Sequence, residues 1–330
     1  MRVSTRRDFI GFGFGTLAAG VLSAYGEQGR EIWYAREPQG EAALQMPIMK
    51  GFHPTRLEIE VGARKPFSLL HISDSHLALM NARDLAKADE TELRWYESRR
   101  KAFANAETGL AAALVYAKAK KLPILHTGDL VDYMSDANVR EAQRDLEGRD
   151  VLYAIGNHEH CGTPHPGPGR KELAAARAQL EPYFPNRFTV CSRVMNGVNF
   201  VAFDNVGMCA DLVEREFAAI RAEFAKGLPV VLAYHIPFYT EALADGLMAS
   251  TGYKPQKRSD INEGWLAACP GKPALEINAR LRKWLPEQKN LKALLCGHMH
   301  EESQVDFTDR VRQYVCGATF KGDAYEIVFK

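Results

Sequence analysis

Short apolar runs of strand length recur along the chain, and each is bounded by polar or turn-forming residues. A run of four to eight apolar residues between such boundaries is typical of a buried strand. The pattern predicts strands at 67–72, 123–127, 151–155, 199–204, 229–234 and 292–295. A leading strand is expected near 57–61. Residues 303–329 are expected to form two or three antiparallel strands.

Between these strands, apolar residues recur with the spacing of a helix face. Phe103, Leu110, Leu114 and Ala117 predict a helix over 98–120. Further helices are expected at about 170–181, 212–226 and 276–285. Strands that alternate with helices indicate an α/β fold, and the strand-rich stretches indicate a second sheet packed on the first. Long loops, which often bind ligands, are expected at 163–169 and 236–273.

Composition narrows the class of protein. The 330 residues are 46% hydrophobic and 25% charged, which indicates a globular protein with a sizeable core. The net charge of +1 predicts no strong field that would attract nucleic acid or a membrane surface. None of the six cysteines forms a C-x-x-C pair, which argues against a thiolate zinc cluster. They are either small buried hydrophobes or, in an exported protein, the source of one disulfide.

The first 26 residues have the anatomy of a signal peptide. A charged start is followed by an apolar, Gly-rich run from Phe9 to about Ala24 and by small residues. Arg6 and Arg7, with Phe9, resemble the twin-arginine export signal. That resemblance implies recognition by the twin-arginine export machinery and a mature protein in the periplasm or outside the cell. The apolar core is too short for a membrane span, so we expect tethering only if the signal stays uncleaved.

Polar residues cluster where five of the predicted strands end. In open α/β sheets the carboxyl ends of the strands converge on the ligand crevice, so these residues are expected to meet. The strand ends carry Asp74-Ser75-His76, Gly128-Asp129-Leu130-Val131-Asp132, Gly156-Asn157-His158-Glu159, His235 and Gly297-His298-Met299-His300. Glycines before three of the polar residues are expected to let the chain turn sharply.

Seven of these side chains are candidate metal ligands: two carboxylates, one amide and four imidazoles. They are Asp74, His76, Asp129, Asn157, His235, His298 and His300. Mixed oxygen and nitrogen ligands suit Mn, Fe, Zn, Ni or Co rather than Ca or Mg. Seven ligands are too many for one ion. With one bridging carboxylate, they would serve two divalent ions and leave room for water and substrate.

The motifs D-x-H, G-D-x-x-D, G-N-H-E, a lone His and G-H-x-H, in this order, resemble the calcineurin-like metallophosphoesterase superfamily. The resemblance covers roughly residues 65–330 and implies a four-layer α/β/β/α sandwich of two mixed sheets with the metals at one edge. It divides the chain into a twin-arginine signal peptide (1–26), a linker with the leading strand (27–64) and a catalytic domain (65–330).

The same resemblance implies a role for each residue of the motifs. One metal would be held by Asp74, His76 and His300. The second would be held by Asn157, His235 and His298, with Asp129 bridging the two. His158 would lie beside the scissile phosphate as the acid–base residue, oriented by a hydrogen bond to Asp132. Glu159 is interpreted as structural rather than as a ligand.

The expected activity is hydrolysis of a small-molecule phosphomonoester or phosphodiester by metal-activated hydroxide. A first alternative is a weakly catalytic binding or scaffold protein on the same fold, which would have lost ligand residues. A second is a metal-dependent nuclease, which would need a basic surface or an extra nucleic-acid-binding segment; the net charge of +1 argues against it.

Several residues outside the motifs have two interpretations. His71 and His126 are either buried, hydrogen-bonded histidines or residues that orient metal ligands. His160 and His165 are expected on a loop, in solvent or against substrate. The run Arg99-Arg100-Lys101 could reach a phosphate, but a solvated helix face is the favoured interpretation. Aromatic side chains either wall a pocket or pack in the core at positions Phe238, Tyr239, Tyr253 and Trp265.

Overall fold

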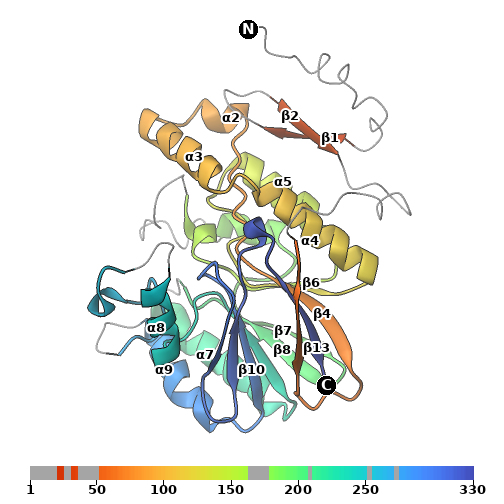
Figure 1. The fold of residues 1–330 in the computed structure, drawn as a ribbon, viewed down its shortest axis with the longest axis vertical. Helices are drawn as coiled ribbons and strands as arrows, with labels where there is room; N and C mark the ends of the chain where they lie inside the picture. The colour runs from red at the N-terminus through yellow and green to blue at the C-terminus, as the bar shows by residue number, and fades with distance from the viewer. Residues whose placement is uncertain are drawn as a thin grey trace.

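The computed structural model describes residues 21–25, 31–35, 52–162, 178–206, 210–250, 255–270 and 275–330. Within them the chain forms two large sheets with helices on their outer faces (Figure 1). Strand β1 (Val21–Tyr25) pairs antiparallel with β2 (Glu31–Ala35). The rest of the expected signal peptide, with Arg6 and Arg7, lies outside the described residues, as do the 163–169 loop and most of the helix expected at 170–181.

The first sheet has five strands in the order β3-β13-β4-β5-β6. They are β3 (Thr55–Ile59), β13 (Tyr325–Phe329), β4 (Phe67–Ile72), β5 (Ile124–His126) and β6 (Val151–Tyr153). The strands predicted at 67–72, 123–127 and 151–155 are thereby confirmed. Strand β13 runs parallel to β3 and antiparallel to β4, so it lies inside this sheet rather than beside the other strands of the 303–329 segment.

The second sheet has six strands in the order β11-β12-β10-β9-β8-β7. They are β11 (Ser303–Asp306), β12 (Arg312–Val315), β10 (Leu291–Cys296), β9 (Val230–Ala233), β8 (Val198–Ala202) and β7 (Cys191–Met195). The four central strands are parallel and both edge strands are antiparallel. Strand β7 was not predicted, because its half-exposed residues show no apolar run.

Alternation along the strands builds the layers. In β9, Val230 and Leu232 face the helices, while Val231 and Ala233 face the other sheet. The inner faces of both sheets share one apolar layer. Helices α4 (Ala106–Lys120) and α5 (Asp136–Leu146) cover the five-stranded sheet, and α7 (Ala210–Ala225), α8 (Glu241–Ala249) and α9 (Glu276–Trp284) cover the six-stranded one (Figure 1). The predicted four-layer α/β/β/α sandwich is confirmed.

The single helix predicted over 98–120 is wrong. Two helices occupy this region, α3 (Glu90–Ala102) and α4, and they follow the short α2 (Ala82–Leu85). The break falls at Phe103, whose φ of −112° and ψ of 41° leave the helical region. The Phe103 side chain is buried, so tertiary packing overrides the continuous helical pattern.

The long loop expected at 236–273 is also corrected, because it contains α8. Thr240 caps this helix by accepting a hydrogen bond from the backbone N–H of Leu243. The apolar side of α8, with Leu243 and Leu247, packs in the outer core, by which we mean the apolar cluster between the six-stranded sheet and its helices. Single turns of 3₁₀-helix complete the described structure at His158–His160, Glu181–Tyr183, Arg258–Asp260, Leu285–Glu287 and Thr319–Lys321.

Five cysteines lie in the described residues, and all are free thiols. Cys296 and Cys316 lie on adjacent strand ends, where the Cys316 N–H donates to the Cys296 carbonyl at 2.8 Å. Their side chains belong to the outer core and the inter-sheet layer respectively, which separates the two thiols. Four of the five are buried, as expected for small hydrophobes, and Cys209 lies outside the described residues. No helix among the described residues is long and apolar enough to cross a membrane.

Candidate metal centre

The carboxyl ends of β4, β5, β6, β9 and β10 bring the seven predicted ligands together. Three groups of carboxylate oxygens and imidazole nitrogens have ligand atoms within 4.8 Å of one another. The groups are Asp74, His76 and His300; His76, Asp129 and His158; and Asp129, His235 and His298. The strand-end convergence expected from the sequence therefore exists in the fold.

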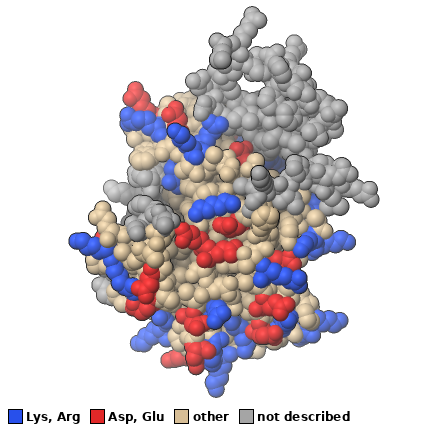
Figure 2. All heavy atoms as spheres, in the orientation of Figure 1, with Lys and Arg blue, Asp and Glu red and all other residues tan. Residues whose placement is uncertain are grey.

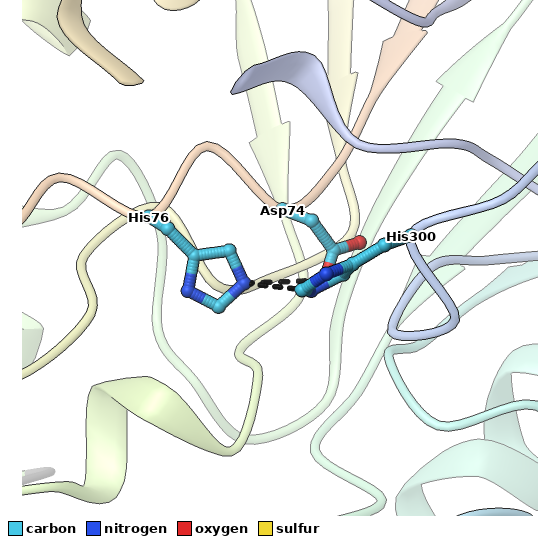
Figure 3. A group of neighbouring side chains, drawn as sticks. All are labelled: Asp74, His76 and His300. Carbon is cyan, nitrogen blue, oxygen red and sulfur yellow. Dashed lines mark hydrogen bonds and ion pairs between the residues drawn. The ribbon is translucent and has the colours of Figure 1, made fainter. Parts of the chain in front are cut away.

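The first group is formed by Asp74, His76 and His300 (Figure 3). The Nε2 atoms of His76 and His300 are 2.9 Å apart. Asp74 Oδ1 lies 3.3 Å from His300 Nε2. This carboxylate oxygen is fully buried and accepts no hydrogen bond of normal geometry from the described residues.

Asp129 joins this group to the group that contains His235 and His298, which we call the second group. Its Oδ2 atom lies 3.1 Å from His235 Nε2 and 3.7 Å from His76 Nε2. His235 Nε2 is in turn 3.1 Å from Asn157 Oδ1 and 3.2 Å from His298 Nδ1. One carboxylate oxygen thus lies between the two sets of donors, as a bridging ligand would.

The outer nitrogens of three imidazoles each face an acceptor. His76 Nδ1 lies 2.9 Å from Asp132 Oδ1, and His235 Nδ1 lies 2.6 Å from the Thr127 carbonyl. His298 Nε2 lies 3.0 Å from the Gly264 carbonyl. A carbonyl or carboxylate accepts only from a protonated nitrogen, so in the neutral form of each ring the second nitrogen carries a lone pair that faces inward. This second set of hydrogen bonds is typical of metal-bound histidine, and the donor set fits two divalent cations.

Electrostatics at the second group favour an exchange of protons for metal. Burial and, after it, the neighbouring His235 lower the pKa of His298 to about 4, so this ligand is neutral. Burial also lowers the pKa of His235, but the Asp129 carboxylate outweighs burial and raises it to about 9. A cation bound at His235 would therefore displace a proton.

Five of the ligand residues have left-handed backbone, which non-glycine residues rarely adopt. Their φ angles are 54° at Asp74, 52° at His76, 55° at Asp129, 73° at His298 and 56° at His300. Such conformations cost about 1–3 kcal/mol each and concentrate at functional sites. Part of the restraint comes from pairing between the two ligand loops, where the His76 N–H donates to the Asp129 carbonyl at 2.9 Å.

The glycines of the motifs permit this crowding. Gly128, with φ of 99°, makes the sharp turn expected from the sequence. Gly156 and Gly297 have a different role, because a Cβ atom at Gly156 would lie 2.2 Å from Asp129 Oδ1. A Cβ atom at Gly297 would lie 1.8 Å from Ser73 Oγ and 2.6 Å from Asp74 Oδ2. Any side chain at these positions would displace a ligand carboxylate.

His158 lies next to the ligands and is held by two aspartates. Its backbone N–H donates to Asp129 Oδ1 at 2.8 Å. Its Nδ1 lies 2.8 Å from the Asp132 carbonyl and 3.1 Å from Asp132 Oδ1. Burial lowers the pKa of His158, but the charges of Asp129 and Asp132 outweigh it and raise the pKa well above its usual value. The predicted contact between Asp132 and His158 is present.

Glu159 binds backbone rather than facing the donors. Its carboxylate accepts from the N–H groups of Asp129 at 2.9 Å, Val131 at 3.1 Å and Gly156 at 2.7 Å. It thereby ties the loop after β5 to the loop after β6. These contacts agree with the structural role expected from the sequence.

His71 and His126 are both fully buried, and burial lowers the pKa of each to about 3. His71 Nε2 lies 2.9 Å from Thr127 Oγ1. His126 contacts Ser75 Oγ at 3.2 Å and accepts from the Gly128 N–H at 3.2 Å, so it supports both ligand loops. His126 therefore meets both interpretations given above.

The expectation for His160 was wrong. It is buried rather than on an exposed loop, and its Nε2 lies 3.3 Å from the equally buried Asp204 carboxylate. Phe238 and Trp265 pack on the outer core rather than lining the metal centre, and Tyr239 does so in part. His165 and Tyr253 lie outside the described residues.

Arg99 was expected in solvent, and this is corrected. Its Nε and Nη2 atoms lie 2.7 Å and 2.5 Å from the two carboxylate oxygens of Asp132. Burial raises the pKa of Asp132, but Arg99 and His158 outweigh it and hold this pKa well below its usual range. Arg99 was considered from the sequence, but its contact with Asp132 was not predicted. The indication that the sequence offered was the position of Arg99 four residues before Phe103.

A cavity of about 530 Å³ opens beside Phe103, whose ring also stacks on His76. It is lined by Ala78, Leu79, Glu97, Arg100, Lys101, Phe103, Ala104, Ala106 and Glu107.

Comparisons with known proteins agree with this arrangement. A sequence model of the calcineurin-like phosphoesterase domain matches residues 67–302. A dimetal phosphatase from Danio rerio is 13% identical with a TM-score of 0.42, over 77% of this chain and 88% of that one. The phosphopantetheinyl hydrolase of Mycobacterium tuberculosis is 15% identical with a TM-score of 0.39, over 77% and 90%.

A putative 5'-nucleotidase from Staphylococcus aureus is 12% identical with a TM-score of 0.39, over 77% of this chain. This chain spans about half of that nucleotidase, 49% of its length. The search among curated proteins gave no match.

Proposed function

The chain belongs to the calcineurin-like phosphoesterase family, and we propose that it is an exported enzyme that hydrolyses a small phosphomonoester or phosphodiester with two divalent metal ions. The observation that carries the proposal is the ligand set: seven side chains on five strand ends turn imidazole nitrogens, an amide oxygen and carboxylate oxygens toward one another. Such sets are used for in-line displacement at phosphorus.

Each residue of the centre receives a role in this proposal. Asp74, His76 and His300 hold one ion, Asn157, His235 and His298 hold the other, and Asp129 bridges them. When bound, two such ions lower the pKa of water and neutralise charge on the phosphate. The chain's own residues position the ester and move the leaving proton.

His158 is the proposed acid. Its Nδ1 is occupied by Asp132, so its Nε2 is the nitrogen available to donate a proton to the leaving oxygen. The raised pKa of His158 supports this role, because the ring holds the proton that it must donate. Asp132 keeps the ring in the tautomer that has Nδ1 protonated.

A small substrate is favoured over a nucleic acid. Lysine and arginine are interspersed with aspartate and glutamate on the face shown in Figure 2, and the net charge is +1. Neither feature provides the basic surface that a phosphodiester polymer would need. A scaffold function is disfavoured, because each predicted ligand position carries a ligating side chain close to the others.

The experiment is a substrate panel with metal-reconstituted protein: p-nitrophenyl phosphate, bis-p-nitrophenyl phosphate, nucleotides and cyclic nucleotides. Turnover of at least one ester that is abolished by a chelator is expected. Two bound ions per chain without turnover of any ester would favour the scaffold alternative instead.

Export is a separate part of the proposal, supported by Arg6, Arg7 and Phe9 and by the apolar run that follows them. The double variant Arg6→Lys and Arg7→Lys is expected to accumulate inside the cell, because the export machinery reads the arginine pair. Fractionation with an antibody to the mature domain measures it. Unchanged export of the double variant would end the twin-arginine interpretation.

A further inference from the structure

Arg99 contacts the centre through Asp132. Both carboxylate oxygens of Asp132 receive a guanidinium nitrogen, at 2.5 and 2.7 Å, in the two-point geometry that Arg forms and Lys does not. The Asp132 side chain is 1% exposed and that of Arg99 is 17% exposed. The pair is therefore largely shielded from solvent screening.

Asp132 divides its remaining contacts between two histidines of different proposed function. Its Oδ1 atom lies 2.9 Å from Nδ1 of the ligand His76 and 3.1 Å from Nδ1 of the proposed acid His158. Any displacement of this carboxylate would move both hydrogen bonds. The position of Asp132 therefore determines the positions of both the metal ligand His76 and the proposed acid His158.

Arg99 reaches His76 by a second route, through Phe103. The guanidinium carbon lies 4.6 Å from the Phe103 ring centroid. The Phe103 ring in turn stacks on the His76 ring, with 4.2 Å between the ring centroids and the planes 5° apart. The Phe103 N–H also donates to the Arg99 carbonyl at 2.9 Å, which fixes the two residues relative to each other at the end of α3.

We propose that Arg99 is a positioning residue that holds His76 and His158 in place together, through Asp132 on one side and Phe103 on the other. The inference rests on the proposed function for the role of His158, whereas the part that concerns His76 stands on metal binding alone. This role also accounts for the end of α3 at Phe103, because a helix that continued through this position would not place the Phe103 ring against His76.

The first test measures metal binding, without turnover. Arg99→Ala is expected to bind one of the two ions about 10–100-fold more weakly, as is typical when a residue that orients a metal ligand is lost, and the other ion nearly normally. Arg99→Lys keeps the charge but not the two-point contact, so we expect an intermediate loss. Arg94→Ala removes an exposed cation of the same helix, which is hydrogen-bonded to Thr91 in its own turn, and is the matched control.

The second test measures kinetics on whichever ester the wild-type protein turns over. For Arg99→Ala we expect kcat to fall about 10–100-fold at saturating metal while KM stays within about twofold. Millimolar guanidinium is expected to restore part of kcat in Arg99→Ala and none in His158→Gln. A residue needed only for folding would change the melting temperature without this rescue.

The outcomes separate the two proposals. Failure of the wild-type protein on every ester would sink the proposed function, and the metal titration would still decide the role of Arg99 toward His76. Wild-type affinity for both ions in Arg99→Ala and Arg99→Lys, with unchanged kcat, would overturn the inference. If Arg99→Ala does not fold, the Arg99→Lys titration against Arg94→Ala decides the same question.

Discussion

The backbone N–H of His158 donates a hydrogen bond of 2.8 Å to Oδ1 of Asp129. The other oxygen of the same carboxylate, Oδ2, lies between the two groups of metal-ligand candidates. The residue proposed to bridge the metals therefore also fixes the main chain of the residue proposed as the acid. Substitutions of Asp129 and of His158 are therefore expected to separate metal binding from acid catalysis.

His158→Gln tests the acid. Since the imidazole is outside the proposed ligand set, the variant is expected to keep both metal ions and lose about 10²–10⁴-fold in kcat. Metal content by elemental analysis and steady-state kinetics on the same sample measure the two effects. Turnover at the wild-type rate would remove His158 from the mechanism.

Asp129→Asn tests the bridge. The change removes the negative charge between the two groups, so we expect fewer than two ions per chain together with loss of activity. Asp150→Asn is a matched control, because the Asp150 side chain is exposed and forms its ion pair with Arg193. Full metal content in Asp129→Asn would contradict the bridging role.

Gly297→Ala tests the crowding around the ligands. The added methyl group would lie 1.8 Å from Ser73 Oγ, so Ser73 and Asp74 must move and metal affinity is expected to fall. Gly246→Ala, on the solvent side of α8 with no atom within 4 Å of the new methyl group, is the control. It is expected to raise stability by about 0.4–1 kcal/mol. Equal metal affinity in both variants would show that the loop at Gly297 yields freely.

His71→Gln tests the buried histidines through pH. Burial lowers the pKa of His71 to about 3 in the folded chain, below its ordinary value of 6.5. As pH falls below 6.5 the unfolded chain takes up a proton that the native chain does not, so the free energy of unfolding drops by about 1.4 kcal/mol per pH unit. Between pH 6.5 and 5 this amounts to about 2 kcal/mol for one histidine.

The variant is therefore expected to lose about 2 kcal/mol less than the wild type on that change of pH. Urea denaturation in the presence of a chelator measures the difference without a contribution from metal release. Identical pH dependence in the two proteins would mean that His71 is protonated in the native state.

The strands and the ligand set were predictable because both depend on local pattern. Five of the predicted strands end just before a ligand motif, so Asp74, Asp129 and Asn157 could be placed together from the strand ends. The left-handed backbone of Asp74 and Asp129 was not predictable, since aspartate adopts positive φ more often than most residues but still at only a minority of its positions.

The features that escaped prediction depend on partners distant in sequence. Arg99 and Asp132 are 33 positions apart, and a charged residue on a helix is ordinarily solvated. Phe103 fits the helical repeat, but α3 ends there and the Phe103 ring stacks on His76, which precedes it by 27 positions. The Gly264 carbonyl that orients His298 is a backbone atom, for which side-chain motifs carry no information.

Strand β13 has a consequence for how the protein folds. It pairs with β3 across some 270 positions of the chain, from Tyr325 to Thr55, and it is also the neighbour of β4. Such a pairing raises the contact order, and the entropy of closing so long a loop slows folding. Asp74 and His76 follow β4, so the catalytic centre is expected to form late in folding, after β13 has paired with β3 and β4.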